Sequence, residues 1–357
     1  MSPARSFRVD LRSDTVTTPS DTMRRAMASA EVGDAWYGDD PTVNRLQERA
    51  AELTGAEAGL YVATGTMANQ IGLRLHVTGN GHLVACEQGS HVATVEVMTS
   101  AVLAGIAFRT GADSPRGVMT PPLAARLLVP DDAFDVEVVD LLEVENTVGH
   151  AGGTVLSSRD MAAIGSIAGA AGVPIHLDGA RIWNAAAATG EPVTAWTSHA
   201  DTAMFCLSKG LGAPIGSVIC GPAAAIGEAR RLWILYGGAW RQAGIMAAAG
   251  LVALETGRDR LVDDHARARR LAAALHEMVP AAIDPAGVET NMVFVHTEAL
   301  GMAAADAIER LAALGVGAVP MSPGVVRMVT HVDVDDEGVA FAIDAWRTVL
   351  TPVAKET

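Results

Sequence analysis

Short apolar runs alternate with helical patterns over most of the 357 residues, and this alternation constrains the fold more than any other feature. Helical segments such as 41–53 and 159–171 begin and end with ordinary capping residues, since Pro41 opens the first and Gly172 follows the second. The alternation predicts an α/β fold in which crossover units build a mostly parallel sheet between helices. The predicted strands cover residues 59–63, 82–86, 138–144, 173–177, 202–207 and 217–220.

The pattern changes after Gly257, where a long charged helix is predicted over 258–278. Beyond Pro280 a second, shorter series of strands and helices indicates a small α/β domain. We therefore predict a large domain of residues 1–257, with the N-terminal segment, and a small C-terminal domain of residues 258–357 that includes the linking helix. The elements predicted after Pro280 are a strand at 292–296, a helix at 303–314, a strand at 325–330 and a helix at 337–350.

Composition excludes several classes of protein. A formal net charge of -15 and an isoelectric point near 5.0 argue against a nucleic-acid or anionic-membrane surface, because such partners require clustered positive charge. The sequence contains no membrane-length apolar run, and its first ten residues lack a secretory signal, so a cytoplasmic location is expected. The three cysteines have no metal-binding spacing and are predicted to be buried thiols; no metal site is predicted.

Lys209 is the first candidate for chemistry, because it directly follows the predicted strand 202–207 and precedes Gly210 and Gly212. A lysine in such a position can lie in a cleft where partial desolvation lowers the pKa of its amine. A neutral amine attacks carbonyl groups, so Lys209 is interpreted as a lysine that forms a Schiff base with a carbonyl cofactor. An ordinary lysine that points to water, or a hydrolytic pair with Ser208, is also compatible with the pattern.

Asp178 follows another predicted strand, about thirty residues before Lys209. Parallel strands open their carboxyl ends onto one crevice, so both side chains would face the same ligand if their strands share a sheet. Pyridoxal phosphate (PLP) requires a carboxylate beside its pyridine nitrogen, and Asp178 is suitably placed. Taken alone, Asp178 is equally compatible with an Asp-Gly turn.

A phosphate site is predicted at Gly65 and Thr66, where a predicted strand passes into a helix. Free N–H groups and the helix dipole bind phosphate at such a position, and the hydroxyl of Thr66 adds a donor. A plain turn with a threonine N-cap would have the same sequence.

Together these segments closely resemble the low-specificity L-threonine aldolases, within the β-eliminating lyase branch of fold-type I PLP-dependent enzymes. The resemblance extends over nearly the whole chain, as far as RMVTH (327–331) and the last helix. The strings that carry it, in order, are DLRSDTVT (10–17), YGDDPT (37–42), GTM (65–67), ENT (145–147), LDGAR (177–181), LSKG (207–210) and RQAG (241–244).

The resemblance implies that the fold is that of fold-type I PLP-dependent transferases and that Lys209 holds PLP while Asp178 pairs with the pyridine nitrogen. His91 matches a histidine that stacks on the cofactor, and its unperturbed pKa suits a base near neutrality; without the family context it could equally cap a helix. The other implied cofactor contacts are Gly65, Thr66, Met67, Glu145, Arg181, Ser208 and Arg241, the last of these from a neighbouring subunit.

The implied substrate site consists of Ser13, Tyr37, Arg181 and Arg327. A guanidinium binds a carboxylate through two parallel hydrogen bonds and thereby fixes the orientation of the substrate. Arg181 could instead pair with Asp178 or a helix end, and Arg327 could be a surface charge.

The implied reaction cleaves threonine, allo-threonine and related β-hydroxy-α-amino acids to glycine and an aldehyde, in a homodimer or homotetramer with active sites at the subunit interface. The substrate amine displaces Lys209, a base takes the β-hydroxyl proton, and the Cα–Cβ bond breaks. Alternatives are a PLP-dependent lyase of the same fold that acts on aromatic β-hydroxy amino acids or eliminates a β-substituent, and a non-catalytic PLP-binding homologue.

Two departures from the family pattern concern the β-hydroxyl. The family's second active-site histidine is absent from the corresponding stretch 132–136, and the chain has Val148, Gly149 and His150 where His-Asn is expected. Either His91 acts alone or His150 takes over. Trp36 stands where a small aliphatic residue is expected, which would reshape the aldehyde pocket.

Overall fold

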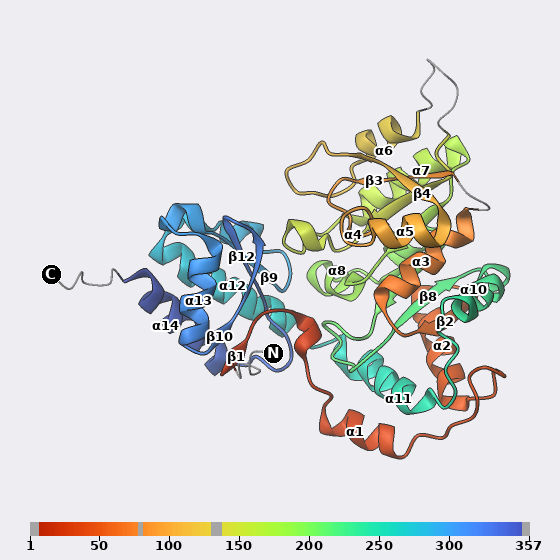
Figure 1. The fold of residues 1–357 in the computed structure, drawn as a ribbon, viewed down its shortest axis with the longest axis horizontal. Helices are drawn as coiled ribbons and strands as arrows, with labels where there is room; N and C mark the ends of the chain where they lie inside the picture. The colour runs from red at the N-terminus through yellow and green to blue at the C-terminus, as the bar shows by residue number, and fades with distance from the viewer. Residues whose placement is uncertain (1–6, 78–80, 130–137, 352–357) are drawn as a thin grey trace.

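The computed structural model describes residues 7–77, 81–129 and 138–351. Figure 1 shows a larger part built on a seven-stranded sheet and a smaller part formed mainly by the C-terminal elements. The strands of the large sheet are β2 (Ala58–Val62), β3 (His82–Glu87), β4 (Ile106–Gly111), β5 (Leu141–Glu145), β6 (Ile175–Asp178), β7 (Thr202–Cys206) and β8 (Ser217–Gly221).

The order of strands across the large sheet is β2-β8-β7-β6-β5-β3-β4. Strands β4, β3, β5, β6 and β7 are mutually parallel, whereas β8 runs antiparallel to both of its neighbours. The sheet is therefore mostly parallel, which confirms the predicted fold class. Because β5, β6 and β7 are adjacent and parallel, the residues that end them lie at one edge of the sheet.

Helices cover both faces of the sheet. Phe205 and Leu177 lie in one core cluster with residues of α2 and α7, whereas Met204 lies in another with residues of α3 and α10. Successive strand residues point to opposite faces, so each strand contributes to two cores. The helices of this part are α1 (Asp21–Ala28), α2 (Pro41–Thr54), α3 (Gly65–His76), α4 (His91–Thr94), α5 (Val97–Ala104), α6 (Pro121–Leu128), α7 (Ser158–Ala171), α8 (Ile182–Thr189), α9 (Thr194–Thr197), α10 (Ala223–Leu235) and α11 (Gly244–Val252).

Helix α2 begins and ends where its sequence requires. The carboxylate of Asp40 accepts hydrogen bonds from the N–H groups of Thr42 and Val43, and Pro41 occupies the first turn, where its missing N–H costs nothing. Gly55 ends the helix at φ 70°, a conformation that favours glycine. The sequence-based prediction of this helix is confirmed.

The smaller part contains an antiparallel sheet of order β11-β12-β9. Its core includes Trp346 and Met328, both fully buried. The elements are α12 (Leu261–Met278), β9 (Met292–His296), α13 (Ala304–Ala313), β10 (Val316–Gly317), β11 (Val319–Ser322), β12 (Val325–Val329) and α14 (Asp336–Leu350).

The N-terminal strand β1 (Val9–Asp10) pairs in parallel with β10, far along the chain. Val9 and Leu11 lie in the same core as Trp346. The N-terminal segment thus packs on the smaller part, although the sequence-based division grouped it with residues 1–257. The division after residue 257 stays a prediction.

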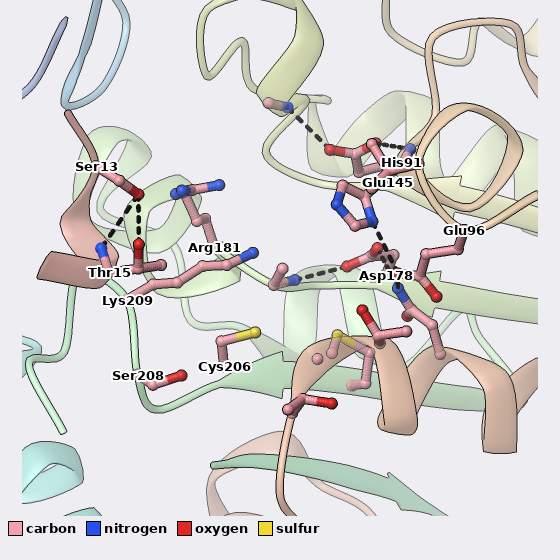
Figure 2. Close-up of a pocket in the computed structure, with 18 of the residues that line it drawn as sticks. Ser13, Thr15, His91, Glu96, Glu145, Asp178, Arg181, Cys206, Ser208 and Lys209 are labelled. Carbon is pink, nitrogen blue, oxygen red and sulfur yellow. Dashed lines mark hydrogen bonds and ion pairs between the residues drawn. The ribbon is translucent and has the colours of Figure 1, made fainter. Parts of the chain in front are cut away.

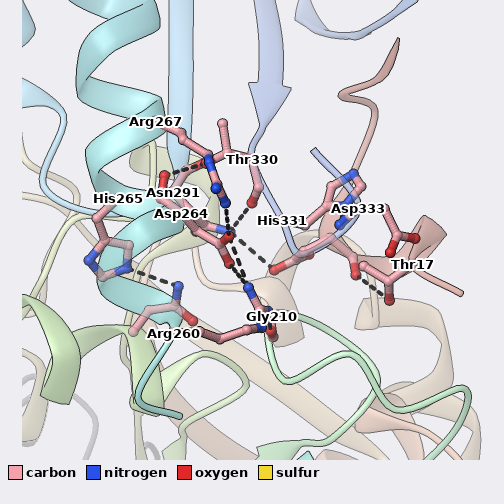
Figure 3. A network of polar contacts seen from close by, with 12 residues as sticks. Thr17, Gly210, Arg260, Asp264, His265, Arg267, Asn291, Thr330, His331 and Asp333 are labelled. Atoms are coloured by element: carbon pink, nitrogen blue, oxygen red, sulfur yellow. Dashed lines mark hydrogen bonds and ion pairs between the residues drawn. The ribbon is translucent and has the colours of Figure 1, made fainter. Parts of the chain in front are cut away.

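A polar network joins the smaller part to the loop after β7 (Figure 3). Arg260 forms an ion pair of 2.8 Å with Asp264 and donates to the carbonyl of Gly210. Asp264 in turn accepts, through its main-chain oxygen, a 2.6 Å hydrogen bond from the hydroxyl of Thr330. These contacts connect the residue after Lys209 with α12 and with the end of β12.

Cys86, Cys206 and Cys220 are free and buried, as predicted. Among the helices that the structure describes, none has both the length and the apolar character needed to cross a membrane.

Candidate active site

A cavity of about 650 Å³ opens at the carboxyl ends of β5, β6 and β7 (Figure 2). Lys209 and Asp178 both line it, so the two residues on which the sequence-based prediction depends face one space. The predicted site residues that line this cavity are Ser13, Gly65, Thr66, His91, Glu145, Asp178, Arg181, Ser208, Lys209 and Arg327.

The loop that carries Lys209 is held by glycines and by the polar network behind it. A side chain at Gly210 would approach Leu261 to 3.0 Å and Asn184 to 3.2 Å, so the loop lies tightly against α12 and α8. Gly212 has φ 81°, in the region that favours glycine. The sequence after Lys209 therefore fixes the backbone from which the amine extends.

Asp178 is 2% exposed, and both of its carboxylate oxygens accept hydrogen bonds. Asn69 donates to Oδ2 at 2.7 Å and the N–H of Ala180 donates to Oδ1 at 3.0 Å. Hydrogen bonds from neutral donors stabilise a charged carboxylate inside a protein. Asp178 is therefore arranged as an acceptor for a further N–H group in the cavity.

The first turn of α3 forms another wall of the cavity. Thr64 caps the helix by accepting from the N–H of Met67, whereas the N–H groups of Gly65 and Thr66 belong to the first turn, where the helix supplies no carbonyl partner. A Cβ atom at Gly65 would lie 2.8 Å from the sulfur of Cys206, so only glycine fits here. This turn can bind an anion such as a phosphate.

His91 is oriented by two carboxylates. Its Nδ1 lies 2.8 Å from Oε1 of Glu96, and its main-chain N–H donates to Glu145 at 2.9 Å. The hydrogen bond that His91 donates to Glu96 raises the pKa of His91 above its usual value, in spite of burial. Burial and the nearby charge of Asp178 raise the pKa of Glu145 to about 7. Both groups can therefore exchange protons near neutral pH.

Two arginines and one aspartate form a charged cluster on the other side of the cavity. Arg181 binds the fully buried Asp14 with two hydrogen bonds, of 2.8 and 2.7 Å, so it pairs with neither Asp178 nor a helix end. Burial opposes the charge of Asp14, but the attraction of Arg181 outweighs it and lowers the pKa of Asp14 to about 2.

Arg327 adds a second positive charge to this cluster. Burial and the neighbouring Arg181 lower the pKa of Arg327, and its buried Nε has no hydrogen-bond partner among the described residues. With one carboxylate between two guanidinium groups, the cluster keeps one net positive charge and an unused donor. It is suited to bind a carboxylate.

Three predicted site residues do not line the cavity. Met67 packs against the core beside α10, and Tyr37 is 77% exposed. Arg241 lies over the ring of Trp36 at 5.1 Å and pairs with Asp34 at 3.5 Å.

Of the two departures from the family pattern, the missing second histidine and the shifted His150, the structure locates only the second. Residues 132–136 lie outside the described residues. His150 lines the same cavity as His91, so either histidine has access to a ligand there.

Sequence reasoning missed three residues of the site, namely Asp14, Asn69 and Glu96. Asp14 lies within the quoted string 10–17, next to Ser13, and its partner could not be deduced from the sequence. Asn69 is one turn beyond Gly65 on α3, and Glu96 follows His91 by five residues. Helical spacing from Gly65 was a signal for Asn69 alone, because residues five positions apart, such as His91 and Glu96, do not share a helix face.

The fold and this cavity define an α/β enzyme whose site combines a lysine, a buried carboxylate and a helix N-terminus. The profile of the β-eliminating lyase family matches residues 10–298. The chain belongs to the β-eliminating lyase family.

Individual relatives agree with this assignment. The low specificity L-threonine aldolase of Escherichia coli (strain K12) is 38% identical over 96% of this chain and 99% of that protein. Low-specificity L-threonine aldolase 1 of Arabidopsis thaliana is 36% identical, with 96% of each chain covered. Among solved structures, the threonine aldolase of Leishmania major superposes with a TM-score of 0.75 at 19% identity and covers 96% of this chain and 99% of that one, a likeness of fold.

Proposed function

We propose that the protein is a PLP-dependent aldolase that cleaves L-threonine, L-allo-threonine and related β-hydroxy-α-amino acids to glycine and an aldehyde. The observation that carries the proposal is the meeting of Lys209, Asp178 and the first turn of α3 in one cavity. The family match and the threonine aldolases among the relatives support the same reaction.

The residues present fit PLP. Asp178 offers a buried acceptor for the N–H of a pyridinium ring, the N–H groups of Gly65 and Thr66 suit its phosphate, and Lys209 supplies the amine. When bound, PLP takes up the electrons of the breaking Cα–Cβ bond. Metal ions have no part in this assignment.

The charged cluster would orient the substrate. Arg327 and Arg181 together exceed Asp14 by one positive charge, which favours the α-carboxylate of an amino acid. Ser13, which precedes Asp14 and lines the cavity, adds a hydroxyl. Fixing the carboxylate decides which bond at Cα is held for cleavage.

His91 is assigned to take the proton of the β-hydroxyl, and His150 is the alternative. A base must be neutral to accept a proton, so the raised pKa of His91 predicts that cleavage increases as the pH rises through that pKa. The pKa of Glu145 is raised to about 7, so the pH profile needs variants for its assignment. Comparison of His91→Asn and His150→Asn at several pH values distinguishes the two histidines. Only replacement of the base should change the acid limb of the pH–rate profile.

The central experiment incubates the purified protein with PLP and several β-hydroxy amino acids and measures glycine and aldehyde. Release of both, lost in Lys209→Ala, is the expected result. A keto acid with ammonia would instead indicate β-elimination, and cleavage restricted to aromatic substrates would narrow the substrate class. A protein that takes up no PLP would contradict the proposal.

A second copy of the chain is proposed to complete the site, as the family resemblance implies, in a homodimer or homotetramer. Support comes from Tyr37, which is exposed together with Trp36, and from Arg241, none of which lines the cavity of its own subunit. Mixing Lys209→Ala and Arg241→Ala chains should restore activity in hybrid dimers if Arg241 acts across an interface. Absence of restoration in verified hybrids would contradict this assignment. The cytoplasmic location stays a prediction.

A further inference from the structure

Asn69 lies between two buried carboxylates of the site. Its Nδ2 is 2.7 Å from Oδ2 of Asp178 and 3.2 Å from Oε1 of Glu96, and all three side chains are 2% exposed. Ionised carboxylates only accept hydrogen bonds, so the amide nitrogen must be the atom that faces both of them. One amide therefore donates to two separate charges.

The opposite end of the amide is also fixed. Its Oδ1 lies 3.3 Å from Nε2 of His176, a ring that is fully buried. Burial lowers the pKa of His176 to about 3, so the ring is neutral at ordinary pH. Nε2–H then donates to Asn69, and Nδ1 accepts from the hydroxyl of Thr202 at 2.9 Å.

The chain of hydrogen bonds continues from His176 through Thr202 to His76. The hydroxyl of Thr202 uses its single proton toward His176 and accepts from Nε2 of His76 at 2.8 Å. Gly72 makes room for the ring, since a Cβ atom there would lie 2.1 Å from Cε1 of His176. The oxygen end of the Asn69 amide is thus held by partners that lie outside the cavity, while its nitrogen end faces the two carboxylates of the site.

Glu96 extends the arrangement to His91. Its Oε1 is 2.8 Å from Nδ1 of His91, and its Oε2 accepts from Nε2 of Gln70 at 2.9 Å. We propose that Asn69 is a positioning residue that fixes Asp178 directly and His91 through Glu96, so that one amide orients both the carboxylate assigned to the pyridine nitrogen and the histidine assigned as base. The link to the cofactor rests on the proposed function.

Removal of the Asn69 amide would deprive both carboxylates of a donor at once. A buried carboxylate that loses a hydrogen-bond donor is held less firmly, and its charged form is less stabilised. Asp178 would then support a protonated pyridine nitrogen less well. The titratable groups that interact with Asp178 are His91, Glu143, Glu145 and His176.

Asn69→Ala and Gln70→Ala form a matched pair for a test. Both residues lie on α3, are 2% exposed and donate to Glu96, but only Asn69 contacts Asp178. Carbon NMR of the carboxyl groups and ring NMR of the histidines, in PLP-free protein at one pH, should show a displaced carboxyl resonance for Asp178 in Asn69→Ala alone. The ring resonances of His91 should be displaced in both variants, because Glu96 loses a donor in each.

PLP affinity supplies the second readout. Loss of a hydrogen bond to a charged group corresponds to roughly a 10- to 100-fold weaker Kd, expected for Asn69→Ala and absent for Gln70→Ala. An unchanged carboxyl resonance of Asp178 in Asn69→Ala would overturn the inference. A wild-type protein that binds no PLP would contradict the proposed function, while the NMR result in PLP-free protein would still decide the role of Asn69.

Thr202→Val keeps the inference testable if Asn69→Ala does not fold. This nearly isosteric change removes the hydroxyl that orients His176, and Thr202 does not line the cavity. A smaller displacement of the Asp178 carboxyl resonance, in the same direction, is expected. A folded Thr202→Val protein with wild-type resonances of Asp178 and His91 would overturn the inference.

Discussion

Two polar regions of the cavity are built in different ways. The sheet floor, defined here as Asn69, His176 and Asp178, comes from one strand of the large sheet and the helix packed on it. The carboxylate anchor, defined as Asp14, Arg181 and Arg327, comes from three segments that are distant in the chain. The segments of Asp14 and Arg327 pack on the core of the smaller part. The floor is therefore fixed by packing within the large sheet, whereas the anchor depends on how the larger part and the smaller part are joined.

This difference separates the expected effects of mutation. Changes in the floor should act on the cofactor and on the chemical step, while changes in the anchor should act on substrate affinity. Asp178→Asn and Arg327→Ala test this separation, and Gly72→Ala and Glu143→Gln test how the residues around the floor are packed and charged.

The largest effect is expected for Asp178→Asn in the sheet floor. The change preserves shape but removes the charge, and loss of one preorganised electrostatic partner costs about 10²- to 10³-fold in kcat. Steady-state kinetics with saturating PLP and threonine measures it. A kcat close to that of the wild type would remove Asp178 from the cofactor role.

Arg327→Ala in the anchor should act mainly on KM. Loss of a charge-assisted hydrogen bond of about 1.5–3 kcal/mol corresponds to roughly a 10- to 150-fold higher KM, with a smaller change in kcat. Arg116→Ala is the matched control, because Arg116 pairs with Glu289 at 2.8 Å and lies outside the cavity. A large fall in kcat with unchanged KM would break the proposed division of labour.

Gly72→Ala tests the packing beneath the floor. The added methyl group would meet the ring of His176, and overpacking of this kind costs about 1–3 kcal/mol. Gly227→Ala, where nothing lies within 4 Å of the added Cβ, should instead stabilise α10 by about 0.5–1 kcal/mol. Urea unfolding of both variants measures the contrast, and equal effects would show that His176 can move aside.

Glu143→Gln should have the smallest effect on catalysis, and its effect on stability should depend on pH. Burial, with the charges of Asp178 and Glu145, raises the pKa of Glu143 well above 4.5 in the folded state. Stability from the neutral acid is complete below the unfolded pKa and is lost as the pH rises toward the folded pKa.

The wild type should therefore lose up to about 1.4 kcal/mol per pH unit in that window relative to Glu143→Gln. Urea titrations of PLP-free protein from pH 5 to 8 test this, with exposed Glu277→Gln as the control. Parallel curves for the wild type and Glu143→Gln would contradict a protonated Glu143.

The sequence predicted Asp178 and Lys209 better than the anchor, although it gave no role to Asn69 and His176, the other two residues of the sheet floor. Asp178 and Lys209 each follow a buried apolar strand, and parallel neighbours necessarily bring such residues to one edge. Strand β4 was missed because Arg109 and Thr110 interrupt its apolar character at the sheet edge. The six predicted strands of the large sheet all overlap observed strands.

The anchor could not be derived in the same way. Asp14 and Arg181 lie far apart in the chain, and no local sequence pattern identifies their pairing. The two-residue strands β1 and β10, which bring Asp14 into position, are too short to produce a periodic signal. Only the family resemblance indicated Arg181 and Arg327, and it assigned no role to Asp14.

The pairing of β1 with β10 also has a consequence for biosynthesis. A ribosome makes Val9 and Asp14 early, but Val316, which pairs with Val9, and Arg327, which completes the anchor, leave it only near the end of translation. The nascent chain can fold its large sheet beforehand, since domains fold as units during synthesis. It should therefore acquire the ability to hold PLP before it can recognise an amino acid, and a stalled or truncated product would sequester the vitamin without turning over substrate.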